Sequence, residues 1–188
     1  RCAYELSDAN VDIIGYACLV AIMSMGLGYH EASENNLHKC TIQNQNKTPV
    51  ITSAGALITG LKDLNSRKIA LLCPYMKNLA KTVVNYISNE GFEVCDWHTL
   101  QIPNNLDVAA HDPKNLIDHA YNLKLDDVDV IVVSACVQMP SLSIIPKLEQ
   151  ITQKPVISAA VCTVYSMLKS LNLEPIVPDA GTLLAGDY

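Results

Sequence analysis

One short phrase occurs twice in this chain, and its two copies constrain the fold more than any other feature. Residues 11–18 read Val-Asp-Ile-Ile-Gly-Tyr-Ala-Cys, and residues 128–136 read Val-Asp-Val-Ile-Val-Val-Ser-Ala-Cys. Each copy has an apolar, β-branched body, which predicts a buried strand of a parallel sheet. In open α/β sheets, ligands and catalytic groups gather at the carboxyl ends of such strands. The sequence therefore predicts two strands that each deliver a thiol, Cys18 and Cys136, at the C-terminal end.

A second pair of matching segments follows the first. Residues 48–54 read Thr-Pro-Val-Ile-Thr-Ser-Ala and residues 154–160 read Lys-Pro-Val-Ile-Ser-Ala-Ala, and each leads into a helical pattern with a similar end, at 61–65 and at 168–172. Strand and helix patterns alternate along the chain, which predicts a parallel sheet built from βαβ units. Self-similarity at this scale predicts an α/β protein of two flavodoxin-like lobes, related by a pseudo-twofold axis, with the active site in the cleft between them.

The repeat also predicts domain boundaries. We expect residues 1–66 to form the remainder of a first lobe, residues 67–172 a second lobe, and residues 173–188 a C-terminal tail that packs back on the first lobe. A full βαβ unit precedes Cys136, whereas only 17 residues precede Cys18. If the lobes match, about 50 upstream residues of the first lobe are absent from this sequence.

Two polar segments predict connections between these units. Residues 31–48 include Asn-Gln-Asn-Lys at 44–47, which favours a solvent-facing connection. Residues 101–111 include Pro-Asn-Asn, a composition typical of turns, and predict a loop.

Composition limits the classes of partner. Apolar residues make up 49% of the chain and charged residues 17%, which is typical of a packed α/β protein and not of a disordered one. The net charge is −6 with scattered lysines and arginines, which argues against a nucleic acid or an anionic membrane surface as partner. No apolar run reaches the roughly 18 residues of a membrane span. A small molecule is the expected ligand.

The seven cysteines form no CxxC pair and are odd in number, so neither a disulfide framework nor a zinc site is predicted. The five histidines show no metal-ligand spacing either. Reduced thiols are typical of a reducing compartment, and we therefore predict a cytoplasmic location.

A thiol pair at two strand ends suggests a particular chemistry. A cysteine at a strand end and helix start meets backbone N–H donors and the positive end of the helix dipole, and both favour the thiolate. The same N–H groups can hold a carboxylate. Two such cysteines on opposite walls can act as acid and base, or as nucleophile and proton donor. A lone cysteine in an apolar run is more often a small buried hydrophobe, but recurrence at equivalent points of a repeat favours chemistry.

Four motifs resemble a known family. They are Gly-Tyr-Ala-Cys-Leu-Val-Ala at 15–21, Thr-Ser-Ala-Gly-Ala-Leu at 52–57, Leu-Cys-Pro-Tyr-Met at 72–76 and Ser-Ala-Cys at 134–136. In this order they resemble the aspartate/glutamate racemase superfamily and, within it, most closely the maleate cis–trans isomerases. The resemblance covers nearly the whole chain. It implies isomerisation of maleate to fumarate without a metal or organic cofactor. It also implies that the protein is a homodimer.

The resemblance also implies a role for each site residue. Cys18 is the nucleophile, whose thiolate adds to one alkene carbon of maleate and gives a succinyl-thioether. Cys136 supplies and recovers the proton at the neighbouring carbon, and rotation followed by elimination releases fumarate. Tyr75 and Asn105 match substrate-binding residues of the family. The remaining carboxylate contacts come from the backbone N–H groups of Leu19, Val20, Val137 and Gln138.

Three alternatives stay open at this point, one of them less favoured. An amino-acid or hydantoin racemase of the same superfamily would use both cysteines for proton transfer at one carbon. An arylmalonate-type decarboxylase is less favoured because it lacks the first cysteine. A non-catalytic small-ligand-binding domain of this fold would leave the thiols inert. Alkylation in the presence of maleate separates these classes, since joint protection of Cys18 and Cys136 favours the enzyme.

Overall fold

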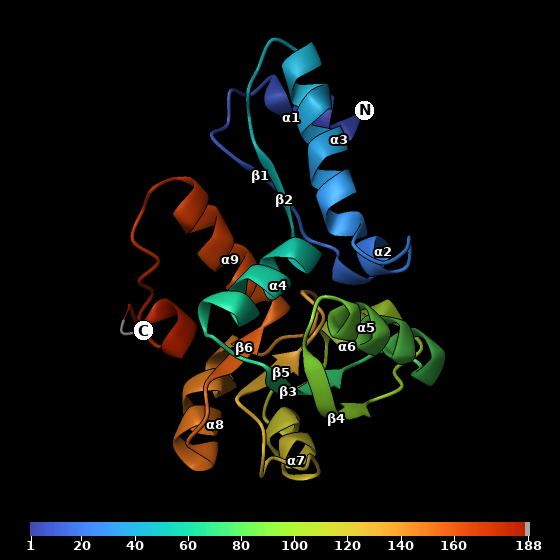
Figure 1. Ribbon diagram of the computed structural model, residues 1–188, viewed down its shortest axis with the longest axis vertical. Coiled ribbons are helices and arrows are strands. Elements are labelled where there is room, and N and C mark those ends of the chain that lie inside the picture. The colour runs from blue at the N-terminus through green and yellow to red at the C-terminus, as the bar shows by residue number, and fades with distance from the viewer. Residues whose placement is uncertain (187–188) are drawn as a thin grey trace.

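Six strands form two separate parallel sheets in residues 1–186, the part of the chain that the computed structural model describes (Figure 1). The smaller sheet pairs β1 (Ile14–Tyr16) with β2 (Val50–Thr52). The larger sheet has the order β4 (Glu93–Thr99), β3 (Lys68–Cys73), β5 (Val130–Ser134), β6 (Val156–Ser158). The predicted α/β class with parallel sheets is therefore confirmed.

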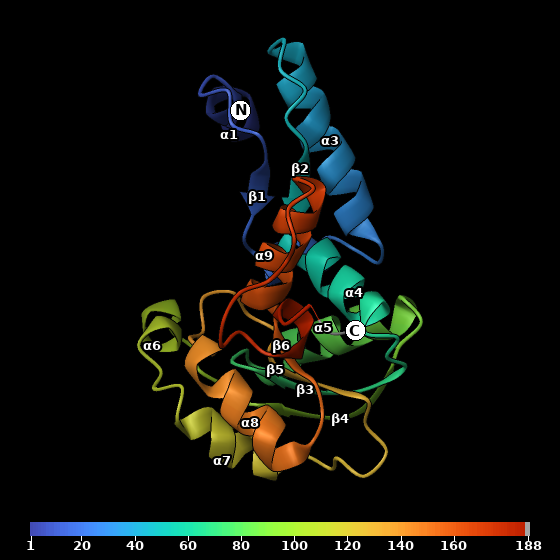
Figure 2. The same ribbon diagram turned by 90° about the vertical axis from the view of Figure 1, so that its left-hand side faces the viewer.

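Helices connect and cover these strands, as Figure 2 shows from the side. They are α1 (Cys2–Ser7), α2 (Leu19–Met23), α3 (Tyr29–Gln43), α4 (Ser53–Asp63), α5 (Lys77–Asn89), α6 (Asn105–Ala109), α7 (Asn115–Tyr121), α8 (Ile145–Thr152) and α9 (Ala159–Ser170), with short 3₁₀ turns at Leu142–Ile144 and Thr182–Leu184. None of the helices described in residues 1–186 is long and apolar enough to cross a membrane.

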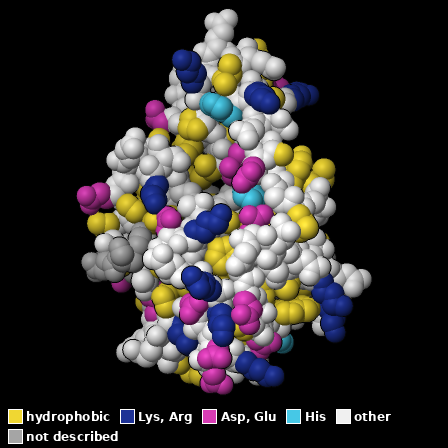
Figure 3. All heavy atoms as spheres, in the orientation of Figure 1, with side chains coloured by type: hydrophobic (Ala, Val, Ile, Leu, Met, Phe, Trp, Pro, Cys, Tyr) yellow, Lys and Arg dark blue, Asp and Glu magenta, His cyan; other side chains and the backbone are white. Residues whose placement is uncertain are grey.

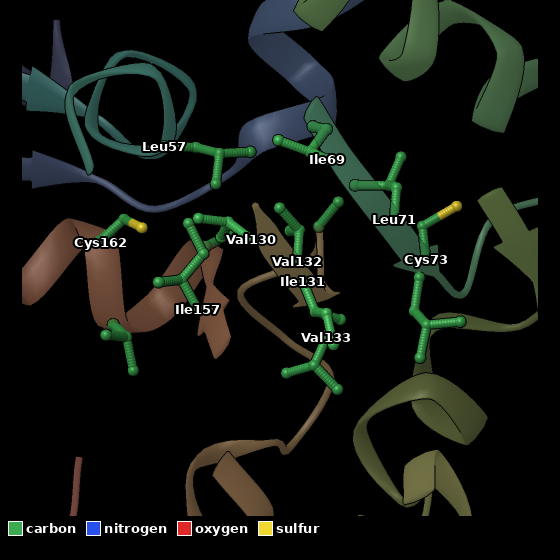
Figure 4. Packing of buried hydrophobic residues seen from close by; sticks show 14 of the residues in the cluster. Leu57, Ile69, Leu71, Cys73, Val130, Ile131, Val132, Val133, Ile157 and Cys162 are labelled. Carbon is green, nitrogen blue, oxygen red and sulfur yellow. The ribbon is translucent and has the colours of Figure 1, made fainter. Parts of the chain in front are cut away.

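The core centres on the larger sheet and on buried side chains of the helices around it, including α2, α4, α5, α8 and α9. Every residue of β5 is buried, as the continuous β-branched run predicts for a central parallel strand. Figure 4 shows Leu57 of α4 and Ile69 of β3 close to Val130 of β5, and all three are buried. Burial of these side chains fixes the positions of the strand ends, from which the site residues emerge.

The sequence repeat reappears as a structural repeat. Thr52 caps α4 by accepting from the N–H of Gly55 at 3.0 Å, and Ser158 caps α9 by accepting from the N–H of Val161 at 3.2 Å. The residues that follow the two helices, Asn65 and Asn172, adopt matching left-handed conformations with φ of 51° and 54°. The two capped helices pack against each other, which joins the two halves.

The C-terminal tail contacts both halves. The N–H of Thr182 donates to the carboxylate of Glu149 in α8 at 2.9 Å. Leu183 lies against α4, with a methyl carbon 3.2 Å from the position that a Cβ on Gly60 would occupy. The last two residues of the predicted tail segment, 187–188, lie outside the described residues. The division of the chain at 66 and 172 stays a prediction.

Two predicted connections are wrong. Residues 31–48 contain most of the 15-residue helix α3, and residues 101–111 contain α6. The only buried side chains of α3 are those of His30, Ser33 and Thr41, so the helix has no apolar stripe that a periodicity search detects. Tertiary contacts, not local apolar pattern, support this helix.

Basic and acidic side chains intermix on the face shown in Figure 3. This mixture agrees with the scattered charges of the sequence and with its net charge of −6.

Candidate active site

The two repeated strands deliver their cysteines to one pocket. Cys18 lies two residues after β1 and is the N-cap residue of α2. Cys136 lies two residues after β5. Both line the same cavity, although they come from different sheets and are separated by 118 positions in the chain, 136 minus 18. The repeat thus places two thiols on one enclosed space.

This pocket encloses about 100 Å³. Sites for drug-sized ligands typically measure about 300–1,000 Å³, so this pocket suits a molecule of only a few heavy atoms. Its lining residues are Ala17, Cys18, Leu19, Val20, Tyr75, Asn105, Val108, Cys136, Val137 and Gln138. The structure brings together all eight residues predicted for the site. Ala17 and Val108 are lining residues that the sequence reasoning did not include.

Several backbone N–H groups on these lining residues have no hydrogen-bond acceptor among residues 1–186, and four of them follow the two cysteines directly, those of Leu19, Val20, Val137 and Gln138. Unsatisfied N–H groups carry partial positive charge and are suited to anions, especially at the first turn of a helix. Two of them belong to the first turn of α2, and two to the turn after Cys136. The pocket therefore offers N–H donors for an anion next to each cysteine in the chain.

The surroundings of the two cysteines differ. Cys18 lies directly at a helix start, whereas Cys136 opens a turn, and the 3₁₀ turn before α8 begins at Leu142. Cys18 is exposed, whereas Cys136 is buried. The hydroxyl of Ser134 donates to the carbonyl of Cys136 at 2.7 Å and accepts from its N–H at 3.3 Å. These two bonds fix the backbone of Cys136 in place of a helix.

Tyr75 lies on the loop after β3 and reaches across to the same turn. Its hydroxyl donates to the carbonyl of Ala135 at 2.9 Å, and the hydroxyl of Thr99 donates to the carbonyl of Tyr75. Burial raises the pKa of the Tyr75 phenol, and negative charge on Cys136 raises it further. The phenol therefore stays protonated at neutral pH and is available as a donor.

Cys73, the last residue of β3, is a third thiol near the pocket. Burial raises its pKa to about 11, charge on Cys136 adds to this effect, and a hydrogen bond with Thr99 opposes it. At neutral pH Cys73 is therefore an uncharged thiol and a poor nucleophile.

Larger hollows lie elsewhere on the molecule and contain neither Cys18 nor Cys136. One of about 340 Å³ lies among α3, α4 and α9 and is lined by residues such as His30, Glu34 and Lys62. Within residues 1–186, no group of three or more His, Cys, Asp or Glu side chains could hold a metal ion. The two-cysteine pocket is therefore the candidate active site.

Three histidines gather beside the segment that carries α6. The ring centroids of His98 and His119 are 5.2 Å apart, and those of His111 and His119 are 6.3 Å apart. Nε2 of His111 is buried with no hydrogen-bond partner among the described residues. Burial lowers the pKa of His119, and the neighbouring His98 and His111 lower it further, against an opposing effect of Asp118.

This histidine group predicts a loss of stability in acid. Because the pKa of His119 is lower in the folded state, the unfolded chain binds more protons once the pH falls below the ordinary histidine value near 6.5. The contribution of neutral His119 to the stability of the folded state is fully present above that value. It is lost as the pH falls towards the folded-state pKa of His119. We expect His119→Gln to reduce the loss of Tm between pH 7 and pH 5, as measured by circular dichroism. An identical loss in the wild type and the variant would contradict this role.

Comparison with known proteins identifies the family of this chain. A family model described as arylmalonate decarboxylase matches residues 7–184, and the chain belongs to this family. The chain is 58% identical over 188 residues to the maleate isomerase of Pseudomonas putida and 54% identical to that of Geobacillus stearothermophilus, in each case over 100% of this chain and 75% of the relative. The predicted resemblance to the maleate cis–trans isomerases is thus confirmed.

Solved structures give the same result. A crystal structure of a cysteine-to-alanine variant of Pseudomonas putida maleate isomerase with maleate superposes with a TM-score of 0.98 at 56% identity, covering 100% of this chain and 75% of that one. A second structure is the Nocardia farcinica maleate cis–trans isomerase, a cysteine-to-serine mutant with a covalently bound succinylcysteine intermediate. Its TM-score is 0.97 at 40% identity, and the match covers 100% of this chain and 77% of that one. The structure of arylmalonate decarboxylase has a TM-score of 0.83 at 18% identity, and this likeness shows the shared two-lobed fold alone.

Proposed function

We propose that this chain is an isomerase that converts maleate to fumarate through a covalent succinyl-cysteine intermediate. The observation that carries the proposal is the pocket of about 100 Å³ in which Cys18 and Cys136 share a lining with four unbonded backbone N–H groups. Maleate is a small dianion with two carboxylates on one side of a double bond. A small pocket with a pair of N–H groups next to each cysteine in the chain matches that shape and charge.

Each step moves a defined electron pair or proton. The Cys18 thiolate adds to one alkene carbon of maleate and forms a C–S bond, and the adjacent carbon takes the proton of the Cys136 thiol. The former double bond is now single and rotates. The Cys136 thiolate then removes the proton, the double bond re-forms in the trans geometry, and the C–S bond breaks to regenerate the Cys18 thiolate. A soft thiolate suits this conjugate addition, and the covalent step replaces one high rotational barrier by lower ones.

The assignment of roles is supported by the positions of the two thiols. Cys18 is exposed at the N-terminus of α2, so its sulfur is open to a substrate in the pocket. Cys136 is buried and its backbone is fixed by Ser134, which suits a proton donor that stays in place. The succinylcysteine intermediate of the Nocardia farcinica mutant forms in a protein that has lost a different cysteine.

Tyr75 and Asn105 complete the proposed binding site. The protonated Tyr75 hydroxyl can turn from the Ala135 carbonyl to a carboxylate oxygen. The side-chain amide of Asn105 has no hydrogen-bond partner among the described residues and lines the pocket. Together with the four N–H groups, these side chains give each carboxylate several donors and need no basic side chain.

Mass spectrometry of a Cys136→Ala variant incubated with maleate tests the proposal. In this variant water must supply the proton to the neighbouring carbon, and no base at position 136 remains to remove it. We therefore expect the adduct to form slowly and to persist, so that the intact mass rises by one substrate and peptide mapping locates the increase on Cys18. The Cys18→Ala/Cys136→Ala double variant is the matched control and should gain no mass. An adduct on Cys136 in a Cys18→Ala variant, together with no adduct on Cys18 in the Cys136→Ala variant, would reverse the roles. No adduct on any folded variant would argue against covalent isomerisation.

We further propose that the enzyme works as a homodimer in the cytoplasm. The homodimer is expected from the family resemblance, and exposed apolar side chains such as Leu106 and Met25, at 75% and 63% exposure, are available for subunit contacts. The cytoplasmic location is supported by seven cysteines that are all free. Sedimentation velocity of the purified protein tests the dimer, because a monomer at micromolar concentration would contradict it.

A further inference from the structure

The short helix α6 carries one wall of the candidate site but has few connections to the rest of the molecule. It contributes Asn105 and Val108 to the pocket lining. Its backbone bonds are local, such as the N–H of Val108 to the carbonyl of Asn104 at 3.2 Å. The side chain of Asn104 caps the helix by accepting from the N–H of Leu106 at 3.0 Å. Figure 2 shows α6 at the edge of the molecule.

One hydrogen bond joins this helix to the other elements described in residues 1–186. The side-chain Nε2 of Gln138 donates to the backbone carbonyl of Asn105 at 2.8 Å. Within the described part of the chain, it is the only hydrogen bond that links residues 103–111 to another element. A five-residue helix is far too short to be stable by itself, so its position depends on such external contacts. The other anchor is Val108, which is buried.

We propose that the side chain of Gln138 is a positioning residue that latches α6 over the pocket and thereby holds Asn105 at the substrate. Gln138 lies on the turn that follows Cys136, so the latch connects the turn of the proposed proton donor with the helix of the proposed carboxylate ligand. This inference rests on the proposed function for the role of Asn105. It gives the Gln138 side chain a task separate from that of its backbone N–H.

The latch should affect binding more than chemistry. A residue that binds the substrate carboxylate contacts the substrate in the ground state and in the transition state alike. A misplaced Asn105 therefore weakens the binding of the ground state and of the transition state equally. Such a loss raises KM and leaves kcat nearly unchanged. A general loss of folding would instead lower the amount of active enzyme and leave KM unaltered.

Gln138→Met tests the latch because methionine has a similar shape and cannot donate. We expect KM for maleate to rise about tenfold, equivalent to about 1.4 kcal/mol, while kcat stays within about twofold. Gln138→Lys restores a donor at similar reach and should recover at least part of the loss in KM. Gln150→Met, an exposed glutamine on α8, is the matched control and should behave as wild type.

Hydrogen exchange of the unliganded protein tests the latch without any turnover. In Gln138→Met, amide exchange in α6 should become about tenfold faster, while exchange in β5 stays unchanged. Unchanged exchange in α6 would overturn the latch whatever the enzyme's activity. Faster exchange with unchanged KM would overturn the role of the latch in substrate binding. If the wild type does not isomerise maleate, the proposed function is refuted. Faster exchange in α6 of Gln138→Met would still show that the Gln138 side chain positions this helix.

Discussion

Serine in place of Cys18 is expected to lower kcat for maleate isomerisation by at least about 10³-fold. The nucleophile in conjugate addition is the thiolate, and an alcohol is not ionised to a useful extent at neutral pH. The substitution changes one atom at an exposed position, so the fold and the pocket lining should persist. Fumarate formation followed by proton NMR measures the change, and circular dichroism confirms that the variant is folded.

Cys95→Ser provides the matched control for this loss. Cys95 is also an exposed thiol, but it lies on β4 and outside the pocket lining. We expect this variant to retain wild-type kcat and KM. If Cys18→Ser kept more than about a tenth of the wild-type rate while Cys95→Ser was normal, then nucleophilic addition by Cys18 would be refuted.

The repeat made the central part of the fold predictable. Periodic apolar runs identify the strands, and the matching Pro-Val-Ile segments identify helices that begin at the caps Thr52 and Ser158. These features are local in sequence, and each agrees with the tertiary structure around it. The same repeat indicated that the strand ends carrying Cys18 and Cys136 belong together, and both cysteines line one pocket.

The helices that sequence reasoning missed lack this agreement between pattern and burial. In α3 a histidine, a serine and a threonine take the buried positions, and their hydrogen bonds replace apolar packing. Nδ1 of His30 lies 2.6 Å from the hydroxyl of Tyr86, and the hydroxyl of Thr41 donates to the carbonyl of Thr48 at 2.8 Å. Such partners are distant in sequence or lie in turns, so no local pattern reveals them.

The residues of the candidate site differ in how far the sequence alone indicates them. The cysteines follow from the repeat, whereas Tyr75 and Asn105 depend on the family resemblance. Val108 was missed because its segment was predicted as a loop, and a loop pattern does not indicate which apolar side chain points inward. Ser134 was visible as part of Ser-Ala-Cys, but its two bonds to the backbone of Cys136 require coordinates.

The contact between α4 and α9 joins the two halves of the repeat at close range. At Gly60 of α4, a Cβ atom would lie 2.8 Å from Sγ of Cys162 in α9 and 3.2 Å from a methyl carbon of Leu183. Cys162 is fully buried, and its short side chain has little freedom to move away. Gly60 is therefore required for close approach of the two helices, not for an unusual backbone conformation.

Gly60→Val is expected to lower the free energy of unfolding by about 3 kcal/mol, since a β-branched side chain must force apart a packed interface. Urea denaturation followed by circular dichroism measures the change. Thr59→Val is the matched control because it places the same side chain at the adjacent, exposed position of α4, where we expect a change within about 0.5 kcal/mol. In the Cys162→Ala background, Gly60→Val should cost about 1 kcal/mol less, because the space left by the sulfur accepts part of the valine. Equal costs in the two backgrounds would show that the strain at Gly60 does not arise from Cys162.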